Sequence, residues 1–157
     1  MTRPQRPTTR PRAPRRVGFA SLAALLLCAA PGCKQSDARE CGAPSPCGDP
    51  RDDELTGDTY TCLMEALRDG GPGKVTIRDS RVADSSTDVT VVFGDGEAII
   101  QTSGYSNGEG EYVGEPSQCG LESPAYFQAC LDSPTQSCAS PWNWVVDCAP
   151  VDEFPCP

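Results

Sequence analysis

The chain has 157 residues, and its 22 acidic against 13 basic residues give a formal net charge of −9 at pH 7. A surface this acidic repels phosphate backbones, which argues against nucleic acid as a partner. The chain contains no histidine, which argues against Ser-His and Cys-His nucleophile pairs and against histidine-bound metals.

The first 32 residues have the composition of a secretory signal peptide. Residues 1–16 contain six arginines and no acidic residue, and the residues at 17–30 are largely apolar and end in small side chains. A helix of that length spans about 21 Å, which is shorter than the ~30 Å hydrocarbon core of a bilayer. We therefore expect residues 1–32 to direct export and to be removed.

The end of the apolar run has the pattern of a lipid-attachment site. Ala30, Pro31 and Gly32 stand immediately before Cys33. This stretch resembles the lipobox of bacterial lipoproteins, although that family favours Leu where this chain has Ala30. The resemblance covers the leader alone, and it implies that Cys33 begins the mature protein and joins it to the membrane through acyl chains such as palmitate. Ordinary cleavage near Cys33, without lipid, is the alternative.

The residue after the anchor bears on localisation. Bacterial lipoproteins that are retained in the inner membrane often carry Asp at this position, whereas this chain has Lys34. By resemblance, the protein is expected in the cell envelope, anchored to the outer membrane.

The remaining cysteines fit a disulfide framework. From residue 33 onward the chain has seven basic and 22 acidic residues, a net charge of −15, and few large aliphatic side chains. Such a composition is typical of a disordered chain, but four disulfides contribute on the order of 10 kcal/mol and form outside the cytosol. An even number of cysteines can pair completely. The expected partners are Cys41, Cys47, Cys62, Cys119, Cys130, Cys138, Cys148 and Cys156.

Residues 33–57 are expected to form the lipid anchor and a flexible spacer. They are rich in Pro, Gly, Ser and charged residues, and a local disulfide between Cys41 and Cys47 can close part of the spacer. The acidic stretch 48–58 lacks the ligand spacing of a calcium loop and is expected to be solvated.

Residues 58–157 are expected to form one disulfide-stapled globular domain of the α+β class. Its main helix is predicted over residues 58–69, where Asp58 can cap the start and Gly70 can end the helix. The prediction depends on an apolar stripe at helical spacing. The stripe consists of Tyr60, Leu63, Met64 and Leu67.

An antiparallel meander of three to four strands is expected next. Residues 74–79, 87–93 and 97–103 alternate between apolar and polar side chains, and a short glycine-rich turn joins the last two. Residues 107–115 are a candidate edge strand. The simplest packing places the main helix on the apolar face of this meander.

The last third is expected to be rich in cystine. Ser123 and Pro124 favour the start of a short second helix over residues 124–132. Residues 137–148 are expected to form one strand held at both ends by Cys138 and Cys148. Eight cysteines allow 105 pairings, and the sequence does not choose among them.

Aromatic residues are the candidate binding residues. In a strand, Trp142 and Trp144 face the same way, and Tyr126 and Tyr112 are their candidate neighbours. If exposed, the two indoles form a stacking platform for sugars or an anchor for a peptide; if buried, they supply bulk to a small core. We expect at least one of them to be buried.

The function class that the sequence favours is a lipid-anchored, non-catalytic binding or structural module with a protein or glycan partner. The alternative is a protein-partner or protease-inhibitor scaffold that uses loop 104–115, which presents Tyr105 and Tyr112. A small carboxylate-based hydrolase is less favoured, because no pair of acidic residues stands out. No Cys-x2-Cys pair occurs, so neither a metal nor another cofactor is expected. The acidic surface is either a solvated coat or a match for a basic partner.

Overall fold

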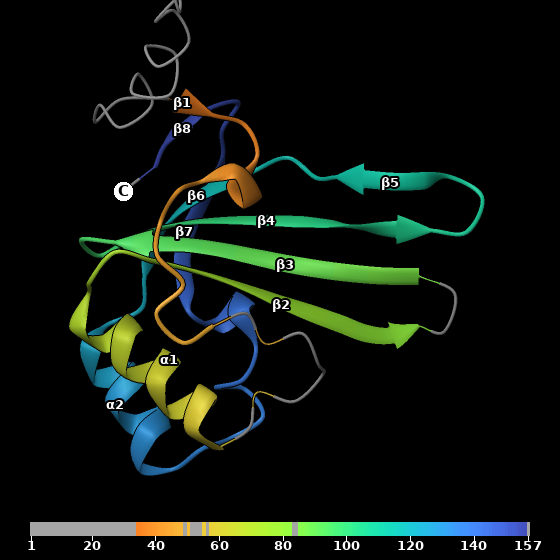
Figure 1. Cartoon of the computed structure of the whole chain (residues 1–157). Coiled ribbons are helices and arrows are strands. Elements are labelled where there is room, and N and C mark those ends of the chain that lie inside the picture. Colours follow the sequence, from red (N-terminus) through yellow and green to blue (C-terminus); the bar gives the residue numbers. More distant parts are fainter. Residues whose placement is uncertain (1–33, 49, 51–54, 56, 83–84, 157) are drawn as a thin grey trace, which may run out of the picture.

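The computed structural model describes residues 34–48, 50, 55, 57–82 and 85–156 (Figure 1). Within these residues the protein has an α+β fold, with two α helices packed on one face of an antiparallel sheet. The helices are α1 (Gly57–Asp69), α2 (Pro124–Asp132) and the 3-10 helices η1 (Ala38–Glu40) and η2 (Pro141–Asn143). The strands are β1 (Lys34–Gln35), β2 (Gly73–Val82), β3 (Ser85–Gly94), β4 (Glu97–Ser106), β5 (Gly110–Val113), β6 (Ser117–Leu121), β7 (Val145–Pro150) and β8 (Phe154–Pro155).

The predicted α+β class is confirmed, and helix α1 lies where its apolar stripe indicated. Tyr60, Leu63, Met64 and Leu67 are all buried against the sheet. Gly70 follows the helix with a φ of 69°, which only glycine adopts readily, and its N–H donates to the carbonyl of Ala66. Asp58, which we expected to cap the helix, lies in its first turn instead.

The central sheet is built on the meander β2-β3-β4, in which each strand is longer than predicted. The strand order is β2-β3-β4-β6-β7, and β5 pairs with the end of β4 that β6 leaves open (Figure 1). Strand β5 is the edge strand expected within 107–115. Strand β6 was not predicted, because its sequence SQCGL has no apolar alternation.

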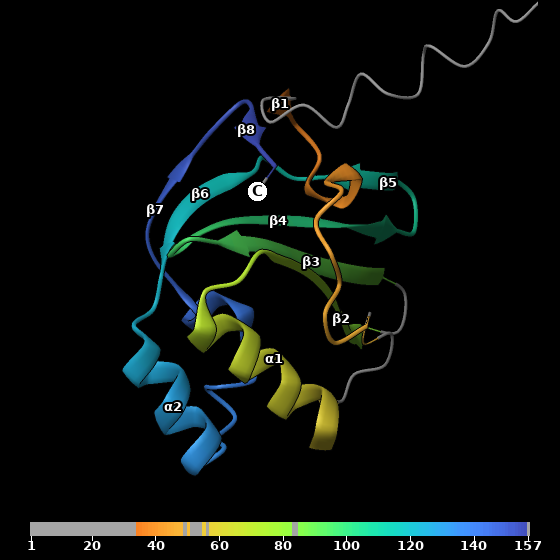
Figure 2. The ribbon, with the colours of Figure 1, turned by 60° about the vertical axis from the view of Figure 1, so that its left-hand side comes forward.

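The main core fills the space between the helices and one face of the sheet (Figure 2). Because neighbouring side chains in a strand alternate between faces, Val89, Val91 and Phe93 of β3 all point toward the helices. From β4, Ala98 and Ile100 join them. The second helix adds Phe127, which is fully buried.

The opposite face of the sheet is covered by the two ends of the described chain. Ala38, Cys41 and Ala43 pack there with Val92 and Ile99 of the sheet and with Phe154 of β8, so they form a second, smaller core. The expectation of a flexible spacer at 33–57 is therefore corrected for residues 34–48, which are part of the domain. The apolar positions in this stretch are small and separated by Gly, Pro and Ser, which hides their burial in the sequence.

Four disulfides join the eight expected cysteines. Cys41–Cys156 and Cys47–Cys62 fix the N-terminal segment to the C-terminus and to α1. Cys119–Cys148 links β6 to β7, and Cys130–Cys138 links α2 to the loop after it. The prediction of a local Cys41–Cys47 disulfide is wrong, because Cys41 is buried on the back face of the sheet while Cys47 lies near α1.

Candidate functional site

The two tryptophans do not share a surface. Trp144 is fully buried in the main core, whereas 53 % of Trp142 is exposed. The single strand predicted at 137–148 is wrong: residues 141–143 form η2, and β7 begins at Val145. Pro141 is the first residue of η2, and the backbone N–H of Trp144 donates to the Pro141 carbonyl. The backbone therefore turns between the two tryptophans, and their side chains point in different directions.

The loop that carries Trp142 is braced from several sides. The Cys130–Cys138 disulfide ties it to α2. The indole N–H of Trp144 donates to the Cys138 carbonyl at 2.8 Å, and the Asn143 side-chain amide donates to the Ser137 carbonyl at 2.9 Å. The neighbouring backbone is closed by successive turns, such as the bond from Cys138 N–H to the Thr135 carbonyl. Trp142 is therefore presented to solvent by a loop with little freedom left to lose on binding.

The other two candidate aromatic residues lie on the β4–β5 hairpin, on opposite faces of the sheet. Tyr105 is 48 % exposed and pairs with Glu111, while Tyr112 is 39 % exposed and pairs with Gly104. Because Gly104 has no side chain, the Tyr112 ring crosses it, and the Tyr112 hydroxyl lies 3.0 Å from Thr87 Oγ1 on the next strand. Tyr112 thus stabilises the hairpin, and Tyr105 is the more available of the pair.

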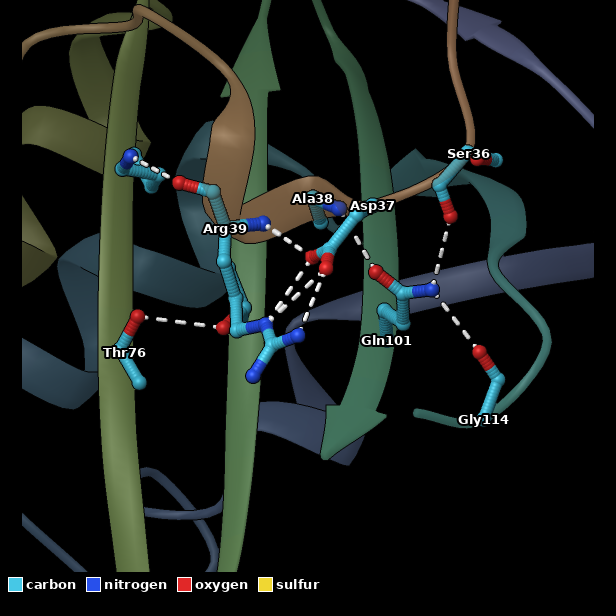
Figure 3. Close-up of polar contacts among 9 residues, drawn as sticks. Ser36, Asp37, Ala38, Arg39, Thr76, Gln101 and Gly114 are labelled. Carbon is cyan, nitrogen blue, oxygen red and sulfur yellow. Dashed lines mark hydrogen bonds and ion pairs between the residues drawn. The ribbon is translucent and has the colours of Figure 1, made fainter. Parts of the chain in front are cut away.

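Sequence reasoning missed a polar cluster on the back face of the sheet, which is shown in Figure 3. Gln101, which is 3 % exposed, accepts a hydrogen bond from the Ala38 N–H at 2.6 Å. Its amide donates to the carbonyls of Ser36 and Gly114. The sequence signal was a Gln that directly follows the apolar residues 98–100. The contacts are all to backbone atoms of this chain, so the cluster holds the N-terminal segment in place and leaves no group for a ligand.

The ion pair beside this cluster joins Asp37 to Arg39, whose side chains are partly buried and exposed, respectively. Arg39 Nη2 lies 2.7 Å from Asp37 Oδ2, and this side-chain hydrogen bond lowers the pKa of Asp37 and raises the pKa of Arg39. The Asp37 carboxylate also accepts from the Arg39 N–H, so it caps η1. A lysine reaches the same segment from β2: Lys74 Nζ donates to the carbonyls of Arg39 and Cys41.

Charge is distributed unevenly along the chain. Residues 82–157, which include the loop that carries Trp142, contain twelve acidic residues and neither Lys nor Arg. Glu122, which is distant from Trp142 in sequence, donates its backbone N–H to the Trp144 carbonyl and so lies beside the end of η2. Trp142 therefore belongs to a segment, residues 82–157, in which the acidic residues are not balanced by any Lys or Arg of the same segment.

Few polar side chains are buried in the described part of the chain. The buried polar side chains in the described part of the chain are Thr90, Gln101 and Ser103, none of which is acidic. Burial raises the pKa of Tyr60, but its hydroxyl lies 3.1 Å from the Cys130 carbonyl and serves the core. Within the same residues, no group of three or more Cys, Asp or Glu side chains is arranged to hold a metal ion.

A small groove lies at the β3–β4 turn. It has a volume of about 200 Å³ and an apolar floor that includes Val92 and Ile99, with Asp95 and Glu97 at its rim. Pockets for small ligands usually measure about 300–1,000 Å³, so the groove is undersized. Trp142 on its braced loop is the better candidate site.

Comparison of the chain with protein-family models, with curated proteins and with solved structures gives no match. In the described residues, neither α1 nor α2 has the length and apolar character needed to cross a membrane.

Proposed function

We propose that this protein is exported, is held at the outer membrane by acyl chains on Cys33, and acts as a non-catalytic module that binds a partner protein through Trp142. The leader and Cys33 lie outside the described residues, so the lipid anchor is supported by the sequence. The disulfides add to that support. All eight cysteines between Cys41 and Cys156 are paired with one another, which leaves Cys33 as the one mature cysteine without a partner in this domain.

The exposure of Trp142 is the observation that carries the binding role. Trp is the residue whose truncation most often removes a large part of the affinity of an interface. Here it lies on a loop fixed by the Cys130–Cys138 disulfide and by the indole of Trp144. A rigid loop loses little conformational entropy on association. Packing of the main core does not account for the exposed indole, because Trp144 belongs to that core and Trp142 does not.

The partner that fits this site is a protein segment rich in Arg or Lys. Residues 82–157, which carry Trp142, supply twelve carboxylates and no Lys or Arg, and this excess of negative charge favours cationic partners. A guanidinium or ammonium group placed over an exposed indole gains about 0.5–1 kcal/mol from the cation–π interaction. The lone indole favours a protein partner over a glycan, because the two-ring platform, which requires both indoles to be exposed, is not formed.

The test compares variants of the mature domain on arrays of Arg- and Lys-containing peptides and on arrays of oligosaccharides. We expect peptide binding, and we expect Trp142→Ala to weaken it by roughly tenfold or more, as the loss of an aromatic anchor does. Tyr105→Ala is the matched control, because it removes an equally exposed ring from a different element. Near-ultraviolet circular dichroism of Trp144 confirms that each variant is folded. Peptide binding that survives in Trp142→Ala contradicts the proposal.

The β4–β5 hairpin is the second candidate, favoured by the exposure of Tyr105. In this alternative the protein is a scaffold that contacts a partner, such as a protease, through loop 104–115. The same experiment separates the two candidates. If Tyr105→Ala abolishes binding while Trp142→Ala retains it, the hairpin is the contact surface.

A further inference from the structure

The described chain is fixed to the domain from its first residue. Lys34 pairs with Pro155 and Gln35 with Phe154 in the two-stranded sheet β1–β8. The carbonyl of Ser36 then accepts a hydrogen bond from Gln101.

The next residues strengthen this attachment. The N–H of Ala38 donates to Gln101, and Ala38 is fully buried. Cys41, three residues later, is joined covalently to Cys156. The structure therefore contains no flexible linker immediately after Lys34.

This arrangement limits how far the domain can lie from its anchor. Cys33 is the residue before Lys34, and consecutive Cα atoms are about 3.8 Å apart. From this geometry, and on the basis of the lipid anchor in the proposed function, we propose that the domain rests directly on the bilayer. The β1–β8 end faces the lipid headgroups.

The surface at this end determines which headgroups it fits. The loop between β7 and β8 carries the exposed Asp152 and Glu153, and its Val151 N–H is bonded to the Pro116 carbonyl. Glu115, Asp152 and Glu153 line an open concavity of about 720 Å³. The three carboxylates outnumber the one cationic residue of β1, Lys34, so the net charge of this end repels anionic headgroups and is compatible with the ammonium groups of zwitterionic lipids. The lipid surface that fits is therefore a zwitterionic one.

The opposite end of the molecule is directed away from the bilayer. Figures 1 and 2 show β1, β8 and the β7–β8 loop at one end of the fold, and α1 and α2 at the other. The main core and the central sheet separate the two ends. A partner in the aqueous compartment therefore meets the helical end first.

The test measures the distance of two introduced tryptophans from the headgroups. Lipidated protein is reconstituted in vesicles of phosphatidylcholine and phosphatidylethanolamine that contain a lipid with a spin label on its headgroup. Trp142→Phe removes the exposed native indole in both samples. Asp152→Trp then places a probe at the membrane-facing end, and Ala125→Trp places the matched probe at the exposed start of α2. We expect strong quenching at position 152 and little at position 125.

Two further measurements test the same orientation, one with an inserted linker and one with a different lipid composition. Inserting ten Gly and Ser residues between Cys33 and Lys34 gives the chain a reach of roughly 17 Å, so quenching at position 152 should fall. Asp152→Trp leaves the carboxylates of Glu115 and Glu153 at this end, so replacing part of the zwitterionic lipid by phosphatidylglycerol should still lower that quenching at low salt. A concentration of 1 M salt should restore it, because the screening length falls to about 3 Å.

Intact mass measured on the same samples distinguishes failure of this inference from failure of the proposed function. Equal quenching at the two positions, or quenching at 152 that the inserted linker does not change, overturns the orientation if the mass shows that Cys33 carries acyl chains. A mass without acyl chains refutes the proposed anchor itself, and the orientation with it.

Discussion

At the scale of single residues, Gln101 is the polar side chain on which the N-terminal segment depends. Its amide oxygen satisfies the buried N–H of Ala38, and its amide nitrogen satisfies the carbonyls of Ser36 and Gly114. A buried backbone group without a partner costs about 1–3 kcal/mol. One side chain therefore fixes two segments that are distant in the sequence.

We expect Gln101→Ala to lower the free energy of unfolding by roughly 3 kcal/mol, because it leaves buried backbone groups without partners. Urea denaturation measures the loss, and hydrogen exchange at the Ala38 amide locates it. The matched control is Gln118→Ala, since the Gln118 amide donates to the exposed carboxylate of Glu97 on the same sheet. If the two variants lose the same stability, or if the Ala38 amide stays protected in Gln101→Ala, Gln101 does not fix the N-terminal segment as described.

At the scale of elements, the β4–β5 hairpin depends on the lack of a side chain at Gly104. A Cβ at this position would meet the carbonyl oxygen of Ser86 and the ring of Tyr112. The Tyr112 hydroxyl spans the glycine to reach Thr87. The hairpin is therefore packed closely across three strands, although β5 has only four residues.

Gly104→Ala should destabilise the domain by about 1–3 kcal/mol, the usual cost of overpacking. Gly120→Ala is the control from the same sheet, because its Cβ would lie 3.4 Å from a methyl group of the half-exposed Val146, which is ordinary contact. The control should stay within about 0.5 kcal/mol of the parent protein. Thermal unfolding of the two variants side by side gives the comparison, and equal midpoints would contradict this packing.

The elements that the sequence predicted well are those with a strong local pattern. The apolar stripe ending at Gly70 located α1, and the Ser123–Pro124 pair located α2 at residues 124–132, as the structure has it. The alternating strands 74–79, 87–93 and 97–103 were found but were predicted too short, because their outer halves are polar. Periodicity is visible in the sequence only where one face of an element is buried.

The elements that the sequence did not predict are held by distant contacts. Strands β1 and β8 have two residues each and exist because they pair with each other. The loop 133–144 is shaped by a disulfide and by the bond from the Trp144 indole to Cys138, which no alternation reveals. The expected burial of one tryptophan therefore proved correct, while the strand that was expected to carry both was wrong.

At the scale of the whole molecule, disulfides close the fold at its two ends. Cys41–Cys156 spans 115 residues, whereas Cys47–Cys62 spans 15. A crosslink restricts the unfolded chain more strongly when it closes a longer loop. The bond between the N-terminal segment and the C-terminus is thus the largest single covalent constraint on this fold.

Replacing both Cys41 and Cys156 by Ala should cost about 2 kcal/mol more than replacing both Cys47 and Cys62, from the ratio of the loop lengths. Guanidinium denaturation without reductant measures both losses. A smaller loss for the Cys41–Cys156 pair would contradict this account of the stability.

The central claim is that Cys33 carries acyl chains while the eight cysteines from Cys41 to Cys156 form four disulfides. Intact-mass spectrometry of the mature protein from its own host, before and after reduction, tests it most directly. We predict a chain that begins at Cys33, carries the added mass of its acyl chains, and gains two hydrogens for each of the four disulfides on reduction. A chain that begins elsewhere, lacks fatty acid, or contains free thiols before reduction would contradict the claim.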